Sequence, residues 1–271
     1  MERLINDFSS SHTMIKIGPA GSAGLGNFDG VKKAKELGLT AFECEFTYGV
    51  SISNEEAKRV GQLAKELNIA LSCHAPYYIN LASEEKPKIH ASKNRILQSC
   101  ERAHHLLAEY VVFHPGFYGK KPKQEVYKLI KNEIIDLLEI IKEKKWNVSL
   151  APETTGKPSQ FGDIDELLQM KKETGCHICV DFAHLKARNN GNVDYNEVFK
   201  KLKPVKHIHS HFSGIEWTAK GERRHLVLEE KDIKELLQYI LKYKADVTII
   251  NESPTMLEDS AEGIRLAKKL F

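Results

Sequence analysis

The sequence lacks long hydrophobic runs, is poor in cysteine, and carries no large excess of charge of one sign. No apolar segment approaches the ~20 residues that a membrane-spanning helix needs, and residues 1–12 contain no stretch resembling a signal peptide. The five cysteines are an odd number, so we expect free thiols rather than a disulfide framework. The net charge of +3 neither requires nor excludes a nucleic-acid partner. Together these absences predict a soluble, cytoplasmic protein.

Short apolar, β-branched segments alternate along the chain with longer amphipathic segments. The expected strands cover residues 14–18, 40–45, 70–74, 110–114, 147–153, 177–181, 206–211 and 246–252. The expected helices cover residues 29–37, 54–67, 91–108, 124–144, 163–172, 194–202, 230–243 and 259–270. Eight strand–helix units are the count of a parallel (β/α)8 barrel. We therefore predict an α/β fold, a single-domain (β/α)8 TIM barrel over residues 1–271, with residues 1–13 as a short N-terminal extension. An open doubly wound sheet is the alternative.

The 12 histidines of the sequence are not spread evenly over this pattern. From the third to the eighth expected strand, every strand ends in His, Glu or Asp, and barrel enzymes build their active sites at these carboxyl ends. The residues concerned are His74, His114, Glu153, Asp181, His184, His211 and Glu252, and the segment after the seventh strand adds Glu222 and His225. This set exceeds the four ligands of one structural zinc, so it predicts a cluster of two or three metals. Paired metals are a usual device for phosphoryl displacement.

The remaining histidines are interpreted as structural. His207 and His209 have the same parity as His211, so all three can face the barrel interior. We expect His209 to be a hydrogen-bonded core residue, with a contact to the metal ligands as the alternative.

Several motifs resemble, in chain order, those of the endonuclease IV family. They are HAPYYINL at residues 74–81, FHPG at 113–116, PETTG at 152–156, VDFAH at 180–184 and NESP at 251–254. Each motif alone is modest, but their order at successive strand ends makes the set specific. The family comprises trinuclear-zinc apurinic/apyrimidinic endonucleases, which are DNA-repair hydrolases built on a (β/α)8 barrel.

The resemblance implies how the ligands divide among the metals. His74 and His114 would hold one zinc, and Glu153 would bridge it to a second. The second site would be completed by Asp181, His211 and Glu252. His184 and His225 would hold a third, to which the family usually adds the Asp of an Asp-x-His segment. Here Arg223 occupies that Asp position, so Glu222 is interpreted as its replacement. We expect two or three Zn²⁺ per chain, with Mn²⁺ as a possible substitute.

The resemblance also implies an activity. The chain would hydrolyse the phosphodiester 5′ to an abasic site with a metal-bound hydroxide positioned by Glu153, leaving a 3′-hydroxyl and a 5′-deoxyribose phosphate. The partner would be double-stranded DNA containing abasic sites, bound by a monomer. The expected DNA-binding residues are Tyr77, which matches a family tyrosine, and the basic residues Lys186, Arg188, Lys220, Arg223 and Arg224. The sequence departs from the family after the second strand, where residues 43–49 are acidic and bacterial members carry a basic DNA-contacting segment.

A metal-dependent sugar isomerase or epimerase of the xylose isomerase-like barrel type is the alternative. Such enzymes use a smaller set of ligands from strands five to eight, which Glu153, Asp181, His211 and Glu252 would supply. The acidic segment after the second strand favours this alternative. The four additional histidines favour the nuclease; they are His74, His114, His184 and His225.

Overall fold

The computed structural model describes residues 14–270, and the predicted extension at residues 1–13 lies outside the described residues. The strands are β1 (Ile15–Pro19), β2 (Ala41–Glu45), β3 (Ala70–His74), β4 (Tyr110–Phe113), β5 (Ser149–Pro152), β6 (Cys179–Asp181), β7 (Ile208–Phe212), β8 (Gly214–Thr218), β9 (Gly221–Leu226) and β10 (Val247–Asn251). The helices are α1 (Asn27–Glu36), α2 (Asn54–Leu67), α3 (Lys86–Leu106), α4 (Lys123–Glu143), α5 (Ile164–Thr174), α6 (Phe182–Arg188), α7 (Tyr195–Leu202), α8 (Glu230–Tyr243) and α9 (Met256–Leu270). Within residues 14–270 no helix is long and apolar enough to cross a membrane.

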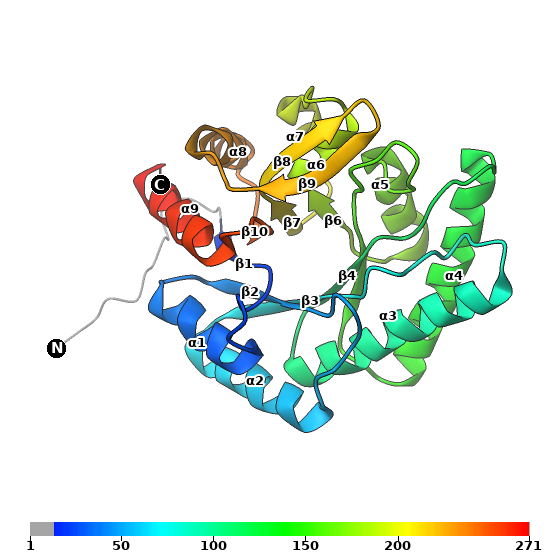
Figure 1. Cartoon of the computed structure of the whole chain (residues 1–271), viewed down its shortest axis with the longest axis horizontal. Helices are drawn as coiled ribbons and strands as arrows, with labels where there is room; N and C mark the ends of the chain where they lie inside the picture. The colour runs from blue at the N-terminus through cyan, green and yellow to red at the C-terminus, as the bar shows by residue number, and fades with distance from the viewer. Residues whose placement is uncertain (1–13, 271) are drawn as a thin grey trace.

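Eight parallel strands close into a barrel. They form two four-stranded ladders, in the orders β1-β10-β7-β6 and β2-β3-β4-β5. Parallel bridges join the two ladders at both edges, between Ala20 and Glu43 and between Glu153 and Cys179. Figure 1 shows the helices around the outside of these strands. The predicted (β/α)8 barrel is therefore confirmed, and an open doubly wound sheet is wrong.

Side-chain caps start several of the helices, whose apolar faces cover the barrel. The Ser53 side chain accepts a hydrogen bond from Glu56 N at 3.1 Å and so caps α2. A capping box formed by Asp163 and Glu166 starts α5. Helices α2 and α3 approach so closely that a Cβ on Gly61 would lie 2.5 Å from the Leu106 carbonyl oxygen. This contact requires glycine at position 61.

One helix and one β-hairpin of the structure were absent from the expected pattern. Helix α6 follows β6 directly, because the Asp181 carboxylate accepts a hydrogen bond from His184 N at 2.7 Å and caps the first turn. The antiparallel hairpin β8–β9 follows β7. Helix α3 also begins at Lys86, earlier than expected, with a proline in its first turn.

The hairpin β8–β9 is fixed to the loop after β5. Glu222 N donates to the Gly156 carbonyl oxygen at 2.9 Å. Gly221 has a φ of +94°, and a Cβ there would lie 2.4 Å from the same oxygen. The approach of the two backbones therefore needs glycine at 221. Figure 1 shows the hairpin on the β6 and β7 side of the barrel.

Candidate metal centre

The side chains predicted as metal ligands converge at the carboxyl ends of the barrel strands. They form three groups, and within each group one ligand atom per residue lies within 4.8 Å of the others. The groups are His74, His114 and Glu153; Glu153, Asp181, His211 and Glu252; and His184, Glu222 and His225. The structure thus brings all nine predicted ligands together, and it divides them as the endonuclease IV resemblance implies.

Glu153 lies between the first two groups. It follows β5 directly, is fully buried, and presents its two oxygens to different neighbours. Its Oε2 lies 3.2 Å from His74 Nε2 and 2.9 Å from His114 Nε2. Its Oε1 lies 3.2 Å from His211 Nδ1 and 3.2 Å from His184 Nδ1. This arrangement would allow Glu153 to bridge two cations.

Two of the histidines are oriented by backbone carbonyls. His74 Nδ1 lies 2.7 Å from the Ala75 oxygen, and His184 Nδ1 lies 3.0 Å from the Thr154 oxygen. A carbonyl only accepts hydrogen bonds, so each Nδ1 carries the proton in the neutral ring. The Nε2 atom of each ring is then free to bind a metal, and such anchoring is usual for metal-binding histidines.

Side chains orient two further histidines. His211 Nε2 lies 2.8 Å from Glu43 Oε1, while its Nδ1 faces Glu153 and lies 3.2 Å from Glu252 Oε1. His225 Nδ1 lies 2.7 Å from Ser213 Oγ. The other ring nitrogens face carboxylates of the site: His211 Nδ1 faces Glu252, and His225 Nε2 faces Glu222.

Glu222 takes the place that its position before His225 predicts. Its Oε2 lies 3.5 Å from His184 Nε2, and its Oε1 lies 3.9 Å from His225 Nε2. Strand β9 supplies both Glu222 and His225, so the hairpin carries two of the three side chains in this group.

Several buried polar atoms of these side chains have no hydrogen-bond partner among the described residues. They include Glu153 Oε1, Asp181 Oδ2, His184 Nε2, His211 Nδ1 and Glu252 Oε2. A buried polar atom without a partner costs free energy. Divalent cations would satisfy all of them at once, and a mixed set of imidazoles and carboxylates suits Zn²⁺ or Mn²⁺. The residues present therefore fit a multinuclear metal site.

Without a cation, the imidazoles and the carboxylates stabilise each other's charged forms. Burial alone would raise the pKa of Glu153, but the positive charges of His114 and His211 outweigh it and hold that pKa well below its usual range. Burial opposes the charged form of His74, yet the hydrogen bond to Glu153 raises the pKa of His74 to about 10. Metal binding to these rings therefore displaces protons.

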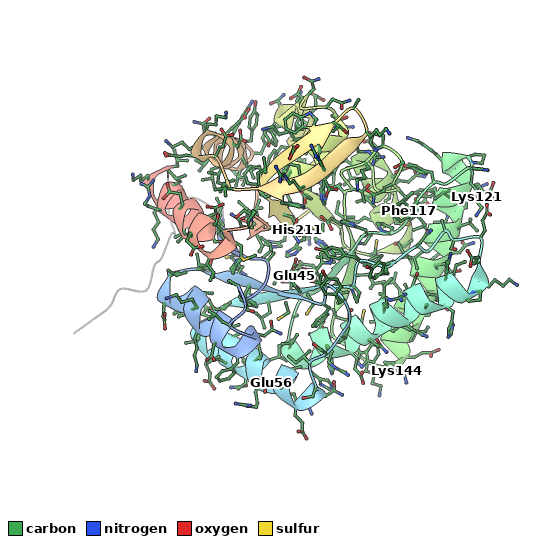
Figure 2. The ribbon with its side chains drawn as sticks, viewed as in Figure 1. Glu45, Glu56, Phe117, Lys121, Lys144 and His211 are labelled. Atoms are coloured by element: carbon green, nitrogen blue, oxygen red, sulfur yellow. The ribbon has the colours of Figure 1, made fainter. Side chains whose placement is uncertain are left out.

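Glu43 belongs to the same network, although the sequence analysis did not assign it to the site. It is fully buried, accepts a hydrogen bond from Ser72 Oγ at 2.6 Å, and lies 3.2 Å from His209 Nε2 and 2.8 Å from His211 Nε2. His209 is thus a hydrogen-bonded core residue, as predicted. Figure 2 labels His211 in the central part of the barrel.

Glu45 was also not assigned to the site. It ends β2, two residues after Glu43, so both side chains face the barrel interior. Burial raises the pKa of Glu45 to about 8. Residues 43–49 were interpreted as an acidic segment after the second strand, but residues 43 and 45 also fall within the expected strand 40–45. Their spacing of two within that strand is the signal that places both side chains inside the barrel.

The predicted DNA contacts have three different environments. Tyr77 is 55% exposed and its ring centroid lies 6.2 Å from that of His74, at the rim of the metal centre. Arg223 and Arg224 are exposed on β9 and pair with Glu216 at 2.8 and 2.6 Å. Lys220 is exposed at the hairpin turn.

Lys186 and Arg188 are held by protein groups instead. Lys186 Nζ pairs with Asp232 at 3.1 Å. Arg188 is only 8% exposed, and its Nη1 donates to the carbonyl oxygens of Thr155, Lys157 and Gln160. The structure gives Arg188 the role of holding the loop after β5, in place of the predicted DNA contact, because its guanidinium points inward.

Comparison with known proteins places the chain in a family. Residues 31–270 match the family described as "Xylose isomerase-like TIM barrel". A protein of Methanocaldococcus jannaschii of uncharacterised function is 39% identical over 246 residues, covering 86% of this chain and 89% of that protein. A "probable endonuclease 4" of Mycoplasmopsis synoviae is 30% identical over 197 residues, covering 67% of this chain and 68% of the relative.

Solved structures share the fold. Endonuclease IV from Thermus thermophilus superposes with a TM-score of 0.73 at 23% identity, covering 94% of this chain and 98% of that one. A D-tagatose 3-epimerase-like protein superposes with a TM-score of 0.73 at 20% identity, covering 94% and 96%. The predicted resemblance to endonuclease IV is confirmed, and the chain belongs to the xylose isomerase-like TIM barrel family.

Proposed function

We propose that this protein is a DNA-repair endonuclease that uses a multinuclear zinc cluster to hydrolyse the phosphodiester 5′ to an abasic site, leaving a 3′-hydroxyl and a 5′-deoxyribose phosphate. The observation that carries the proposal is the third ligand group, made by His184, Glu222 and His225. A sugar isomerase of this fold needs only the four-residue group that contains Glu153. The group made by His184, Glu222 and His225 is therefore additional to the ligands that an isomerase needs, and a third metal would account for it.

The residues of the site have different roles. Glu153 holds the first and second groups at a fixed separation, since one of its oxygens faces each group. His74 and His184 keep their rings oriented through backbone carbonyls, so the site is arranged before substrate arrives. Zn²⁺, when bound, supplies Lewis-acid charge for the phosphate and lowers the pKa of water. Mn²⁺ is a possible substitute.

We propose double-stranded DNA containing abasic sites as the partner, bound by a monomer in the cytoplasm. Tyr77 stands beside the first ligand group, and Lys220, Arg223 and Arg224 extend along the hairpin beside the third. Basic side chains contacting phosphates make affinity fall with salt. An abasic nucleotide leaves the helix easily because its stacking is already lost.

The test is incision of an end-labelled duplex that carries one abasic site, with metal content measured on the same sample. We expect incision with Zn²⁺ or Mn²⁺ and a product ending in a 3′-hydroxyl. Glu153→Ala removes a side chain shared by two groups and should lower kcat/KM about a hundredfold or more, since metal charge supplies several kcal/mol of transition-state stabilisation. Glu55→Ala, on the exposed surface of α2 and outside the ligand groups, is the control. The absence of incision with zinc, manganese and cobalt would refute the proposal.

Sugar epimerisation is the second candidate. It is favoured by Glu43 and Glu45, which place two acidic groups inside the barrel close to the metal ligands. One metal per chain together with turnover of a ketose would establish this function and exclude the nuclease.

A further inference from the structure

The Glu45 carboxyl group lies inside the barrel beside the metal centre and has an oxygen without a partner. Its strand position is in register with His74, which belongs to the first ligand group. Its Oε1 is buried and accepts no hydrogen bond from the residues that the structure describes. A buried carboxyl oxygen without a hydrogen-bond donor costs free energy unless a ligand supplies the donor.

The metals do not account for this oxygen. Among residues 14–270, none of the groups of converging ligand atoms contains Glu45. Glu43, two residues earlier on the same strand, lies against Ser72, His209 and His211, and a carboxylate has no donor to offer to Glu45. Neither the ligand groups nor Glu43 therefore supplies a partner to this oxygen of Glu45.

The surroundings hold Glu45 in place. On one side is Gly21, in the loop after β1, where a Cβ would lie 3.3 Å from Glu45 Cγ and where φ is +88°. On the other side the loops after β2 and β3 are joined, because Tyr77 N donates to the Thr47 carbonyl oxygen at 3.3 Å. Glu45 is thus packed against the β1 loop, and the chain two residues after it is joined to the half-exposed Tyr77.

The covalent structure of DNA limits which donor can reach such a group. Within an intact strand the C3′ and C5′ oxygens of each deoxyribose are esterified, and C1′ carries the base. An abasic deoxyribose in its closed form carries a hydroxyl on C1′. That hydroxyl is the one sugar donor that distinguishes an abasic site from every normal nucleotide of the strand.

We propose that Glu45 is a specificity residue that accepts a hydrogen bond from the C1′ hydroxyl of the abasic deoxyribose. The inference rests on the proposed nuclease function and adds the group of the substrate that is recognised. A normal nucleotide brings a glycosidic nitrogen to the same place and leaves the carboxyl group unpaired. A site built to pair with a hydroxyl discriminates strongly against an analogue that lacks it.

The test compares two duplexes that differ at C1′. One carries a natural abasic site, made by removing uracil with a uracil-DNA glycosylase, and the other carries tetrahydrofuran, which lacks the C1′ hydroxyl. Only ends that a DNA polymerase extends are counted, so that strand breakage by β-elimination is not scored. We expect the wild-type kcat/KM to be about tenfold or more higher for the natural site, because tetrahydrofuran leaves the buried Glu45 oxygen without a donor.

Substitutions at position 45 test whether the preference for the natural abasic site depends on the Glu45 side chain. In Glu45→Met the ratio of the two kcat/KM values should fall to about one, and in Glu45→Gln, which keeps a carbonyl acceptor, it should stay above about threefold. Glu55→Met, on the exposed surface of α2, is the matched control and should keep the wild-type ratio. Near-ultraviolet circular dichroism checks folding, and Glu45→Ala replaces Glu45→Met if the latter does not fold.

The outcomes separate the two proposals. If the wild type incises both duplexes with equal efficiency, or if Glu45→Met keeps the wild-type ratio, the role of Glu45 is refuted while the nuclease function stands. If the wild type incises neither duplex, the nuclease function itself is refuted.

Discussion

Glu153 and Glu222 belong to different numbers of ligand groups, so their removal should reduce metal-dependent stability by different amounts. Glu153 is shared by two groups, whereas Glu222 belongs to one. A cation that binds only the folded chain stabilises it by about 2.7 kcal/mol at a concentration of 100 times its Kd. For a chain of 271 residues, each kcal/mol raises the midpoint of thermal unfolding by about 2 °C.

Three filled sites should therefore raise the midpoint by about 16 °C, two by about 11 °C, and one by about 5 °C. We expect the first value for the wild type, the second for Glu222→Ala and the third for Glu153→Ala. Glu216→Ala, whose side chain pairs with Arg223 and Arg224 on the outside of the hairpin, should behave as the wild type.

The measurement is thermal unfolding followed by circular dichroism, with each protein compared with its own chelated form. This comparison cancels the direct effect of each substitution on the metal-free fold. Metal per chain, determined by mass spectrometry on the same samples, should be three, two and one. If Glu222→Ala keeps the full shift, Glu222 holds no cation. If Glu153→Ala loses no more than Glu222→Ala, the bridging geometry is wrong.

Three further predictions concern stability, each measured by urea unfolding. Arg188→Met should cost about 1–3 kcal/mol, because backbone carbonyls of the loop after β5 lose their buried donor; an unchanged midpoint would contradict this role. Burial lowers the pKa of His177 to about 4, so the unfolded chain takes up a proton near pH 6.5 that the folded chain does not. The wild type should therefore lose up to about 3 kcal/mol more than His177→Phe as the pH falls from 6.5 to 4, and parallel profiles would refute this. Gly61→Ala should cost about 1–3 kcal/mol, since its Cβ meets the Leu106 carbonyl oxygen, whereas Gly263→Ala meets only side-chain atoms at 3.5 Å and should cost nothing.

The barrel strands could be predicted because each is a short apolar, β-branched run between amphipathic segments. The strand Ala70–His74 has the predicted bounds, and Cys179–Asp181 is shorter than predicted only at its start. The hairpin β8–β9 could not be predicted in this way. Strand β9 is polar, and Arg224 pairs with Glu216 across the hairpin, so β9 carries no apolar alternation. Strand β8 alternates over only five residues, with Ile215 and Trp217 as its apolar positions.

The ligand positions could be predicted because strand ends meet wherever a barrel closes, whatever the side-chain details. Glu43 shows where this reasoning stops. Its partner His209 lies 166 residues further along the chain, and only the register of the closed barrel brings the two side chains together. Asp181 also has a second role that was not predicted, since its carboxylate both faces the second ligand group and caps helix α6.

The fixed hairpin gives the barrel mouth one closed side and one open side. Because Glu222 N and Gly221 are held against Gly156, the hairpin stands as a wall over the β6 and β7 side (Figure 1). On the opposite side, the loops after β2 and β3 expose Tyr48 and Tyr77 to solvent. The mouth therefore runs from the tyrosine side, where His74 ends β3, to the hairpin, where β9 carries Glu222 and His225. A substrate that spans the mouth would lie against Tyr77 at one end and against the hairpin arginines at the other.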